Sequence, residues 1–101
     1  MAGFVTVAKV SELGPGEARL VTAGTRKLAL FNIAGTFYAI DNACKHRGGP
    51  LCEGELEGST VICPWHGWEY DVRTGHCESG GAHVNSYPIQ LQGDEIQVAV
   101  E

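Results

Sequence analysis

Two short groups of residues in the middle of the chain each combine a cysteine with a histidine, side chains that bind soft and borderline metal ions. The first group is Cys44-Lys45-His46 and the second is Cys63-Pro64-Trp65-His66, with sixteen residues between them. The intervening segment contains the turn formers Gly54 and Gly58, so it can run out and return as a hairpin. Each group would then offer one thiolate and one imidazole to a shared metal centre.

The order of the ligands distinguishes between kinds of metal centre. In the commoner zinc-finger layout a pair of cysteines precedes a pair of histidines, whereas here each group is mixed. A mixed order suits a binuclear iron-sulfur cluster in which two thiolates hold one iron and two imidazoles hold the other. A tetrahedral zinc site could use the same four side chains, so a zinc-stabilised interaction module with no redox role remains the alternative.

The residues that follow the two groups resemble the sequence boxes of bacterial Rieske ferredoxins. The first box reads Cys44-Lys45-His46-Arg47-Gly48-Gly49-Pro50-Leu51, and the second reads Cys63-Pro64-Trp65-His66-Gly67-Trp68-Glu69-Tyr70-Asp71. The resemblance extends from Phe37 to Gly75. It implies an electron carrier rather than an enzyme, with one Rieske-type [2Fe-2S] cluster. The ligands that it implies are Cys44, His46, Cys63 and His66.

The resemblance also distinguishes between branches of that family. The high-potential branch, in the respiratory cytochrome bc complexes, adds a disulfide between the loops and a serine hydroxyl bonded to a sulfide. The matching positions here are Gly49, Trp65 and Trp68, which can supply neither device. The chain is therefore similar to the low-potential ferredoxins of aromatic-ring dioxygenase systems, whose partners are a reductase and a terminal oxygenase. The small subunit of an NAD(P)H nitrite reductase is the second candidate within the family.

Composition excludes several other classes of protein. The chain has 101 residues and 44% apolar residues, enough for one hydrophobic core but not for two, so we expect a single domain over residues 1–101. Its seven Lys and Arg are scattered and its net charge is −5, which argues against nucleic acid as a partner. The N-terminus lacks a signal-peptide pattern, and no apolar stretch approaches the ~18 residues of a membrane span. We expect a soluble, cytoplasmic monomer.

The elements that would position the ligands are short strands. Apolar and polar residues often alternate in segments rich in Val, Ile, Phe and Tyr, and glycines separate these segments. The pattern predicts an all-β, antiparallel sandwich or partly open barrel, with a small cluster-binding subdomain of two loops over approximately 42–86. At most one helical turn is expected, near residue 12. The predicted strands are Phe4–Val10, Arg19–Thr22, Leu28–Ile33, Phe37–Ile40, Val61–Cys63, Tyr87–Leu91 and Glu95–Val100.

Several chemically capable residues lie outside the two boxes. Cys52 and Cys77 are interpreted as free thiols rather than ligands or a disulfide, because neither lies at ligand spacing. His76 and His83 lie in glycine-rich sequence and are interpreted as surface histidines. Tyr70 is either an ordinary strand aromatic or, by the resemblance, a donor to a cysteine sulfur.

Two further segments complete the expectations. The acidic residues Glu53, Glu55 and Glu57 are interpreted as the solvated face of a turn or an edge strand. In Rieske proteins a third, proline-rich loop covers the cluster. The corresponding segment here, Glu78-Ser79-Gly80-Gly81-Ala82, contains no proline, so its geometry does not follow from the resemblance.

Overall fold

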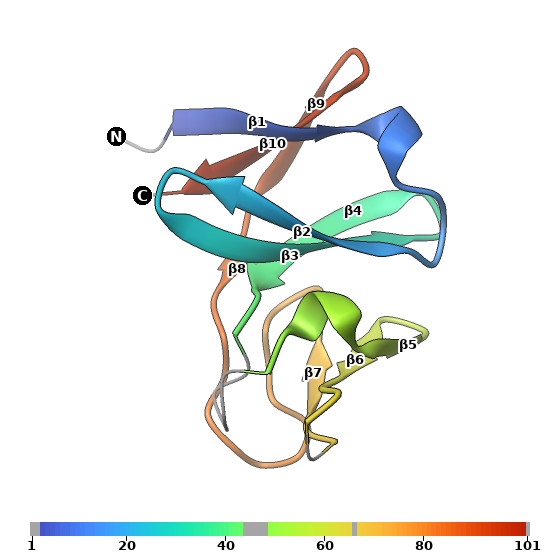
Figure 1. The fold of residues 1–101 in the computed structure, drawn as a ribbon, viewed down its shortest axis with the longest axis vertical. Coiled ribbons are helices and arrows are strands. Elements are labelled where there is room, and N and C mark those ends of the chain that lie inside the picture. The colour runs from blue at the N-terminus through green and yellow to red at the C-terminus, as the bar shows by residue number, and fades with distance from the viewer. Residues whose placement is uncertain (1–2, 44–48, 66, 101) are drawn as a thin grey trace.

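The chain folds as two layers of antiparallel sheet with a third, smaller sheet beneath them (Figure 1). A computed structural model describes residues 3–43, 49–65 and 67–100. Within them the strands are β1 Gly3–Lys9, β2 Ala18–Ala23, β3 Arg26–Ile33, β4 Thr36–Asp41, β5 Glu55–Glu57, β6 Thr60–Ile62, β7 Glu69–Asp71, β8 Ser86–Tyr87, β9 Ile89–Gln92 and β10 Glu95–Val100. Two 3-10 turns, η1 Val10–Glu12 and η2 Leu51–Glu53, are the helical elements of this part of the chain. The all-β prediction is confirmed.

The two larger sheets form the sandwich. One has the strand order β1-β10-β9 and the other β2-β3-β4-β8. Alternate residues of β3 face opposite sides, as the pleat of a strand requires. Leu28 and Leu30 face the interior of the sandwich with Ile96 and Val98 of β10, and all four side chains are fully buried. Both faces of β3 are covered, and this explains why four consecutive apolar residues, Leu28 to Phe31, occur in this strand.

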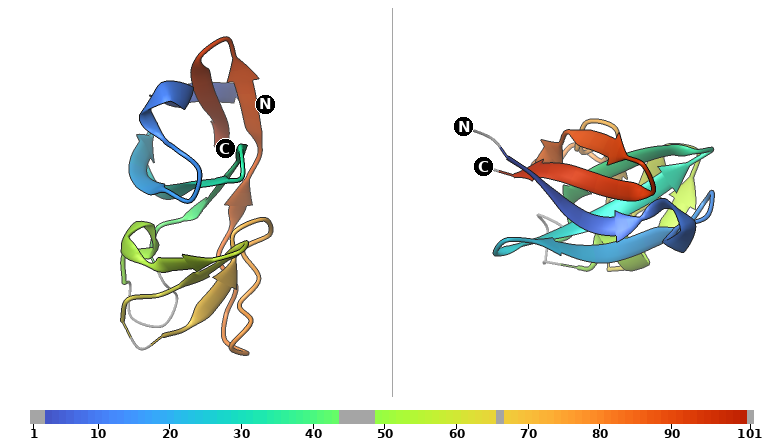
Figure 2. Two further views of the ribbon diagram at one scale, coloured as in Figure 1. Left: turned by 90° about the vertical axis from the view of Figure 1, so that its right-hand side faces the viewer. Right: turned by 90° about the horizontal axis from the view of Figure 1, so that it is seen from above.

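The small sheet, with the order β5-β6-β7, packs on the other face of β3. Figure 2 shows it as a separate layer below the sandwich. Phe31 and Ile40 of the sandwich share a core with Val61, Tyr70 and other residues of the lower layer. This second core ties the lower layer to the sandwich.

The chain leaves the sandwich to form the lower layer, and it returns to the sandwich beside the point where it left. Strands β4 and β8 pair antiparallel through Ile40 and Ser86, so the chain between them begins and ends side by side. The prediction of one strand over Tyr87–Leu91 is wrong in one respect, because Pro88 divides it. Residues before Pro88 pair with β4 and residues after it pair with β10, since proline has no N–H for a continuous ladder.

The acidic segment is confirmed as a turn and the edge strand of a sheet. The turn is a second helical element, η2, whereas the sequence led us to expect at most one helical turn. Glu55 and Glu57 are exposed on β5, the edge strand, whereas Glu53 ends η2. Gly54 joins the two elements, and a Cβ there would meet Val61 Cγ2 at 2.8 Å.

No helix in the described part of the chain is long and apolar enough to span a membrane.

Candidate metal centre

Cys63 is the predicted ligand that lies within the described residues, whereas Cys44, His46 and His66 lie outside them. Cys63 follows β6 and is buried. Its backbone N–H donates to the carbonyl of Trp68 at 2.7 Å, and its carbonyl accepts from the N–H of Gly67 at 3.2 Å. Gly67 has φ of +76°, a conformation that favours glycine. These bonds close a tight loop that fixes the backbone of Cys63.

The end of the first box lies directly against the thiol of the second box. A Cβ on Gly49 would stand 2.8 Å from Cys63 Sγ and 3.1 Å from Cγ of Trp65, closer than side chains pack. Glycine at position 49 is therefore required by this contact, and it leaves the sulfur beside bare backbone. The two boxes approach each other at this point, as their spacing predicted.

The base of the first box is held closed by hydrogen bonds. Ala43 and Pro50 form an isolated antiparallel bridge across the segment 44–49. The carbonyl of Asn42 accepts from the N–H of Leu51 at 2.7 Å, and its side-chain Oδ1 accepts from the N–H of Cys52 at 2.9 Å. The residues before the first box are thus bonded to its last residues, and Leu51 belongs to the core that contains Cys63.

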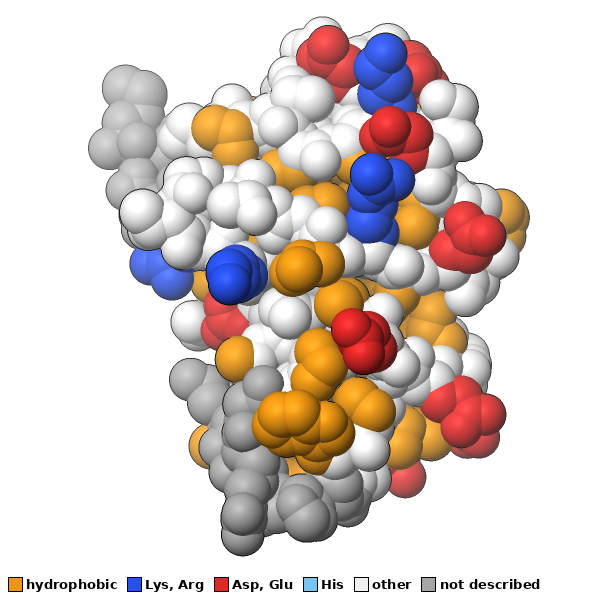
Figure 3. All heavy atoms as spheres, viewed as in Figure 1, with side chains coloured by type: hydrophobic (Ala, Val, Ile, Leu, Met, Phe, Trp, Pro, Cys, Tyr) orange, Lys and Arg blue, Asp and Glu red, His pale blue; other side chains and the backbone are white. Residues whose placement is uncertain are grey.

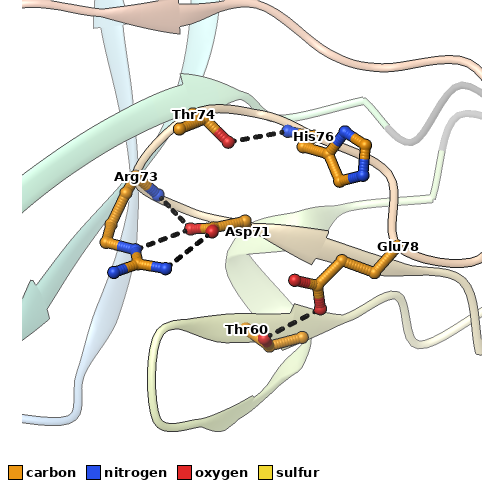
Figure 4. Close-up of polar contacts among 6 residues, drawn as sticks. All are labelled: Thr60, Asp71, Arg73, Thr74, His76 and Glu78. Atoms are coloured by element: carbon orange, nitrogen blue, oxygen red, sulfur yellow. Dashed lines mark hydrogen bonds and ion pairs between the residues drawn. The ribbon is translucent and has the colours of Figure 1, made fainter.

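A third segment, which we call the cover loop (residues 78–82), is fastened to β7. The N–H of Glu78 donates to the carbonyl of Glu69 at 2.8 Å, and the N–H of Glu69 donates to Ser79 Oγ at 3.0 Å. Thr60 Oγ1 of β6 donates to the Glu78 carboxylate at 3.1 Å (Figure 4). Hydrogen bonds to the small sheet therefore place this proline-free loop.

Comparison with known proteins relates most of the chain to one domain family. The sequence profile of the Rieske [2Fe-2S] domain matches residues 3–91. The chain belongs to the Rieske [2Fe-2S] domain family. The biphenyl dioxygenase ferredoxin subunit of Pseudomonas sp. strain KKS102 is 36% identical over 94% of this chain and 90% of its own length.

Solved structures agree with that assignment. One neighbour comes from a complex of reduced oxygenase and oxidised ferredoxin in carbazole 1,9a-dioxygenase; it has 30% identity and a TM-score of 0.88, and the match covers 95% of this chain and 92% of the other. A protein assigned as the small subunit of an NADH-dependent nitrite reductase, from Mycobacterium tuberculosis, has a TM-score of 0.91 at 23% identity, over 100% of this chain and 97% of its own. That second likeness shows the fold alone.

The cofactor of this Rieske domain is one [2Fe-2S] cluster. The described residues fit it, because the thiol of Cys63 is buried and lies beside Gly49, which places no side chain against the sulfur. Thiolate sulfur is the donor that iron-sulfur clusters use.

An ion pair at the far end of β7 was missed by the sequence analysis. The carboxylate of Asp71 accepts from Nε, Nη2 and the backbone N–H of Arg73, at 3.1, 2.9 and 2.9 Å (Figure 4). These bonds lower the pKa of the Asp71 carboxyl below its usual range. The Asp71 carbonyl also accepts from the N–H groups of Thr74 and Gly75, so Asp71 organises the turn that leads to the cover loop. The sequence Asp71-Val72-Arg73-Thr74-Gly75 could have indicated this turn, because an aspartate and an arginine two residues apart precede a glycine.

The cysteines outside the boxes are free thiols, as predicted. Cys77 is buried and Cys52 is half-buried; burial, with the negative charge of Glu53, raises the pKa of the Cys52 thiol. A raised pKa leaves less of the reactive thiolate at neutral pH.

The two remaining histidines are exposed, as predicted, but they are not independent. The rings of His76 and His83 stack with centroids 4.5 Å apart, and Nδ1 of His83 accepts from the N–H of Cys77 at 2.9 Å. Tyr70 is fully buried in the core that contains Cys63. Its role as a donor to a cysteine sulfur stays a prediction.

Proposed function

We propose that this Rieske domain carries single electrons from a reductase to a terminal oxygenase. The observation that carries the proposal is similarity over nearly the full length to ferredoxin components of dioxygenase systems, one of them in complex with its oxygenase. A carrier needs no nucleophile or general base of its own. The chain's residues then have three tasks: to hold the cluster, to limit its contact with water and to present it to a partner.

We propose Cys44, His46, Cys63 and His66 as the ligands of the cluster. Their spacing supports this assignment, and so do the burial of Cys63 and its contact with Gly49. When bound, the cluster supplies a site that accepts and releases one electron, at a potential raised by imidazole ligation relative to four thiolates. With Gly49 and Trp68 in place of the high-potential branch's additional devices, we expect a potential in the low range of the family.

The surface near Cys63 suits contact with another protein. Trp65 follows Cys63 closely in sequence, lies against Gly49 and is 49% exposed. Figure 3 shows hydrophobic side chains gathered toward the lower end of one face of the molecule. Exposed aromatic side chains are enriched in protein interfaces. The acidic chain, with a net charge of −5, favours a basic surface on the partner.

We propose that the protein is a monomer of the cytoplasm, where reducing conditions keep thiols such as Cys52 and Cys77 free. The small subunit of a nitrite reductase remains the second candidate, supported by likeness of fold.

Three measurements test the proposal together. Metal and sulfide analysis of the purified protein should give two irons and two acid-labile sulfides per chain, and the reduced protein should give an EPR signal. One zinc with no sulfide would refute the electron-carrier function.

Product formation by a purified aromatic-ring oxygenase, supplied with a reductase and NADH, should depend on added protein. Activity only with a nitrite reductase large subunit would favour the second candidate. Size-exclusion chromatography tests the monomer.

A further inference from the structure

The second half of the cover loop meets a single aromatic ring. A Cβ placed on Gly81 would overlap the six-membered ring of Trp68, with only 2.8 Å left to its Cε3 atom. The backbone of Gly81 therefore packs against that ring with no room for a side chain. Gly81 does not have a positive φ, so close packing, and not backbone conformation, requires glycine here.

The same tryptophan is bonded to the predicted ligand Cys63. The carbonyl of Trp68 accepts from the N–H of Cys63 at 2.7 Å. The Trp68 side chain is half-buried and packs against the core that contains Cys63 and Tyr70. Trp68 thus contacts both loops. Its backbone carbonyl accepts from Cys63, and its ring packs against Gly81 of the cover loop.

Hydrogen bonds act on the other half of the cover loop. Glu78 and Ser79 are bonded to Glu69 of β7, and this fixes where the loop begins. Beyond them the chain turns at Gly80, which has φ of +89°. The contact between Gly81 and Trp68 comes directly after this turn. The loop is therefore fastened at two places, one polar and one by packing.

We propose that Trp68 and Gly81 are positioning residues that form a latch, which holds the cover loop against the loop carrying Cys63. The inference rests on the proposed function, because it is the cluster that a closed loop would protect. The latch limits the access of water and chelators to the metal centre. It holds in place a cover loop that has no proline to stiffen it. Opening it should speed the loss of the cluster and raise the reduction potential, because water stabilises the more negative reduced state.

The test is a double-mutant cycle on the holoprotein with Gly81→Ala, Trp68→Leu and the double variant. The first readout is the rate of bleaching of the cluster absorbance in excess iron chelator. The second is the reduction potential from protein-film voltammetry, which a change confined to stability would leave in place. Gly81→Ala should release the cluster on the order of tenfold faster, since overpacking forces neighbouring groups apart, and it should raise the potential.

In the Trp68→Leu background the smaller side chain leaves room for the new methyl group, so Gly81→Ala should add little to either readout. Equal effects of Gly81→Ala in both backgrounds would overturn the latch. Gly80→Ala is the neighbouring control, because a Cβ there meets nothing within 4 Å although the positive φ is strained. Release from Gly80→Ala as fast as from Gly81→Ala would also overturn it.

The two proposals fail in different ways. If the protein holds zinc, the electron-carrier function fails, while release of zinc to a chelator still reports whether the two substitutions are coupled. If the protein holds a cluster but the cycle is additive, the latch fails and the proposed function stands.

Discussion

Replacing Asp71 with asparagine tests how the turn beyond β7 is held. The Asp71 side chain is 12% exposed and forms a fork with the Arg73 guanidinium, whose side chain is 56% exposed. In Asp71→Asn the amide Oδ1 can still accept from the backbone N–H of Arg73. The amide nitrogen, however, would face the Nη2 donor, so one bond becomes a contact between two donors.

The expected loss follows from these contacts. A hydrogen bond to a charged group contributes about 1.5–3 kcal/mol when it is buried. Exposure of Arg73 screens the ion pair toward the value of a surface pair, about 0.2–1 kcal/mol. We expect a net destabilisation of about 1 kcal/mol, which lowers the thermal midpoint by roughly 4–8 °C for a domain of this size.

The effect should also depend on pH. Because the Arg73 hydrogen bonds lower the folded-state pKa of Asp71, its contribution is complete above the unfolded-state pKa and is lost as pH falls through the folded-state value. The difference between wild type and Asp71→Asn should therefore be constant from pH 7 to 5. It should narrow below about pH 4, the usual pKa of an aspartate.

The assay is thermal unfolding followed by far-UV circular dichroism at one heating rate, since unfolding that releases a cofactor need not be reversible. Glu57→Gln is the matched control, because it removes the same charge from an exposed position of the same small sheet. A midpoint for Asp71→Asn equal to that of the control would refute the structural role of the fork.

Two further predictions concern the metal centre. Cys44→Ser and Cys63→Ser should each prevent stable cluster assembly, whereas Cys52→Ser and Cys77→Ser should retain two irons per chain by metal analysis; loss of iron from either of the latter two would give that thiol a role we do not assign. Gly49→Ala should reduce the cluster occupancy, because its methyl group would stand 2.8 Å from Cys63 Sγ, and visible absorbance per chain equal to the wild type would contradict the contact.

Local patterns were enough to predict most of the strands and the two boxes. Strand β3 was predictable because it contains four consecutive apolar residues, Leu28 to Phe31, whose side chains are buried on both faces. Turns at glycine separated the strands correctly in most places. Strand β5 and turn η2 were harder, because they are three residues long and their stability comes from contacts with β6 and the core.

Pro88 shows a different limit of sequence reasoning. The residues on either side of it are β-formers, and the pattern alone indicates one strand. The structure assigns them to two sheets. The residues before Pro88 pair with β4, which is remote in sequence, whereas the residues after it form a hairpin with β10, the next strand of the chain. The hairpin with β10 is a local contact, but the pairing of β8 with β4 spans a long sequence separation, and the local pattern did not contain it.

The candidate site divides along the same line. The ligand set could be proposed from the sequence because each box is contiguous, and it stays a prediction; the contact of Gly49 with Cys63 shows that the described parts of the two boxes lie together. The cover loop could not be predicted, since its position depends on Glu69, Trp68 and the pair of His83 with Cys77, none of which forms a local motif. Sequence therefore identified the chemistry, and tertiary contacts supplied its enclosure.

The division of the fold into two cores has a consequence for an electron carrier. Phe31 and Ile40 extend from the sandwich into the lower core, where Val61 and Tyr70 are also fully buried. Since Cys63 belongs to this core, the loop that carries it rests on a packed interior and not on a flexible stalk. Sites built on rigid elements keep their geometry better than sites on unsupported loops. We therefore expect the backbone around Cys63 to move little when a cluster bound there gains an electron, which would suit the proposed role of an electron carrier.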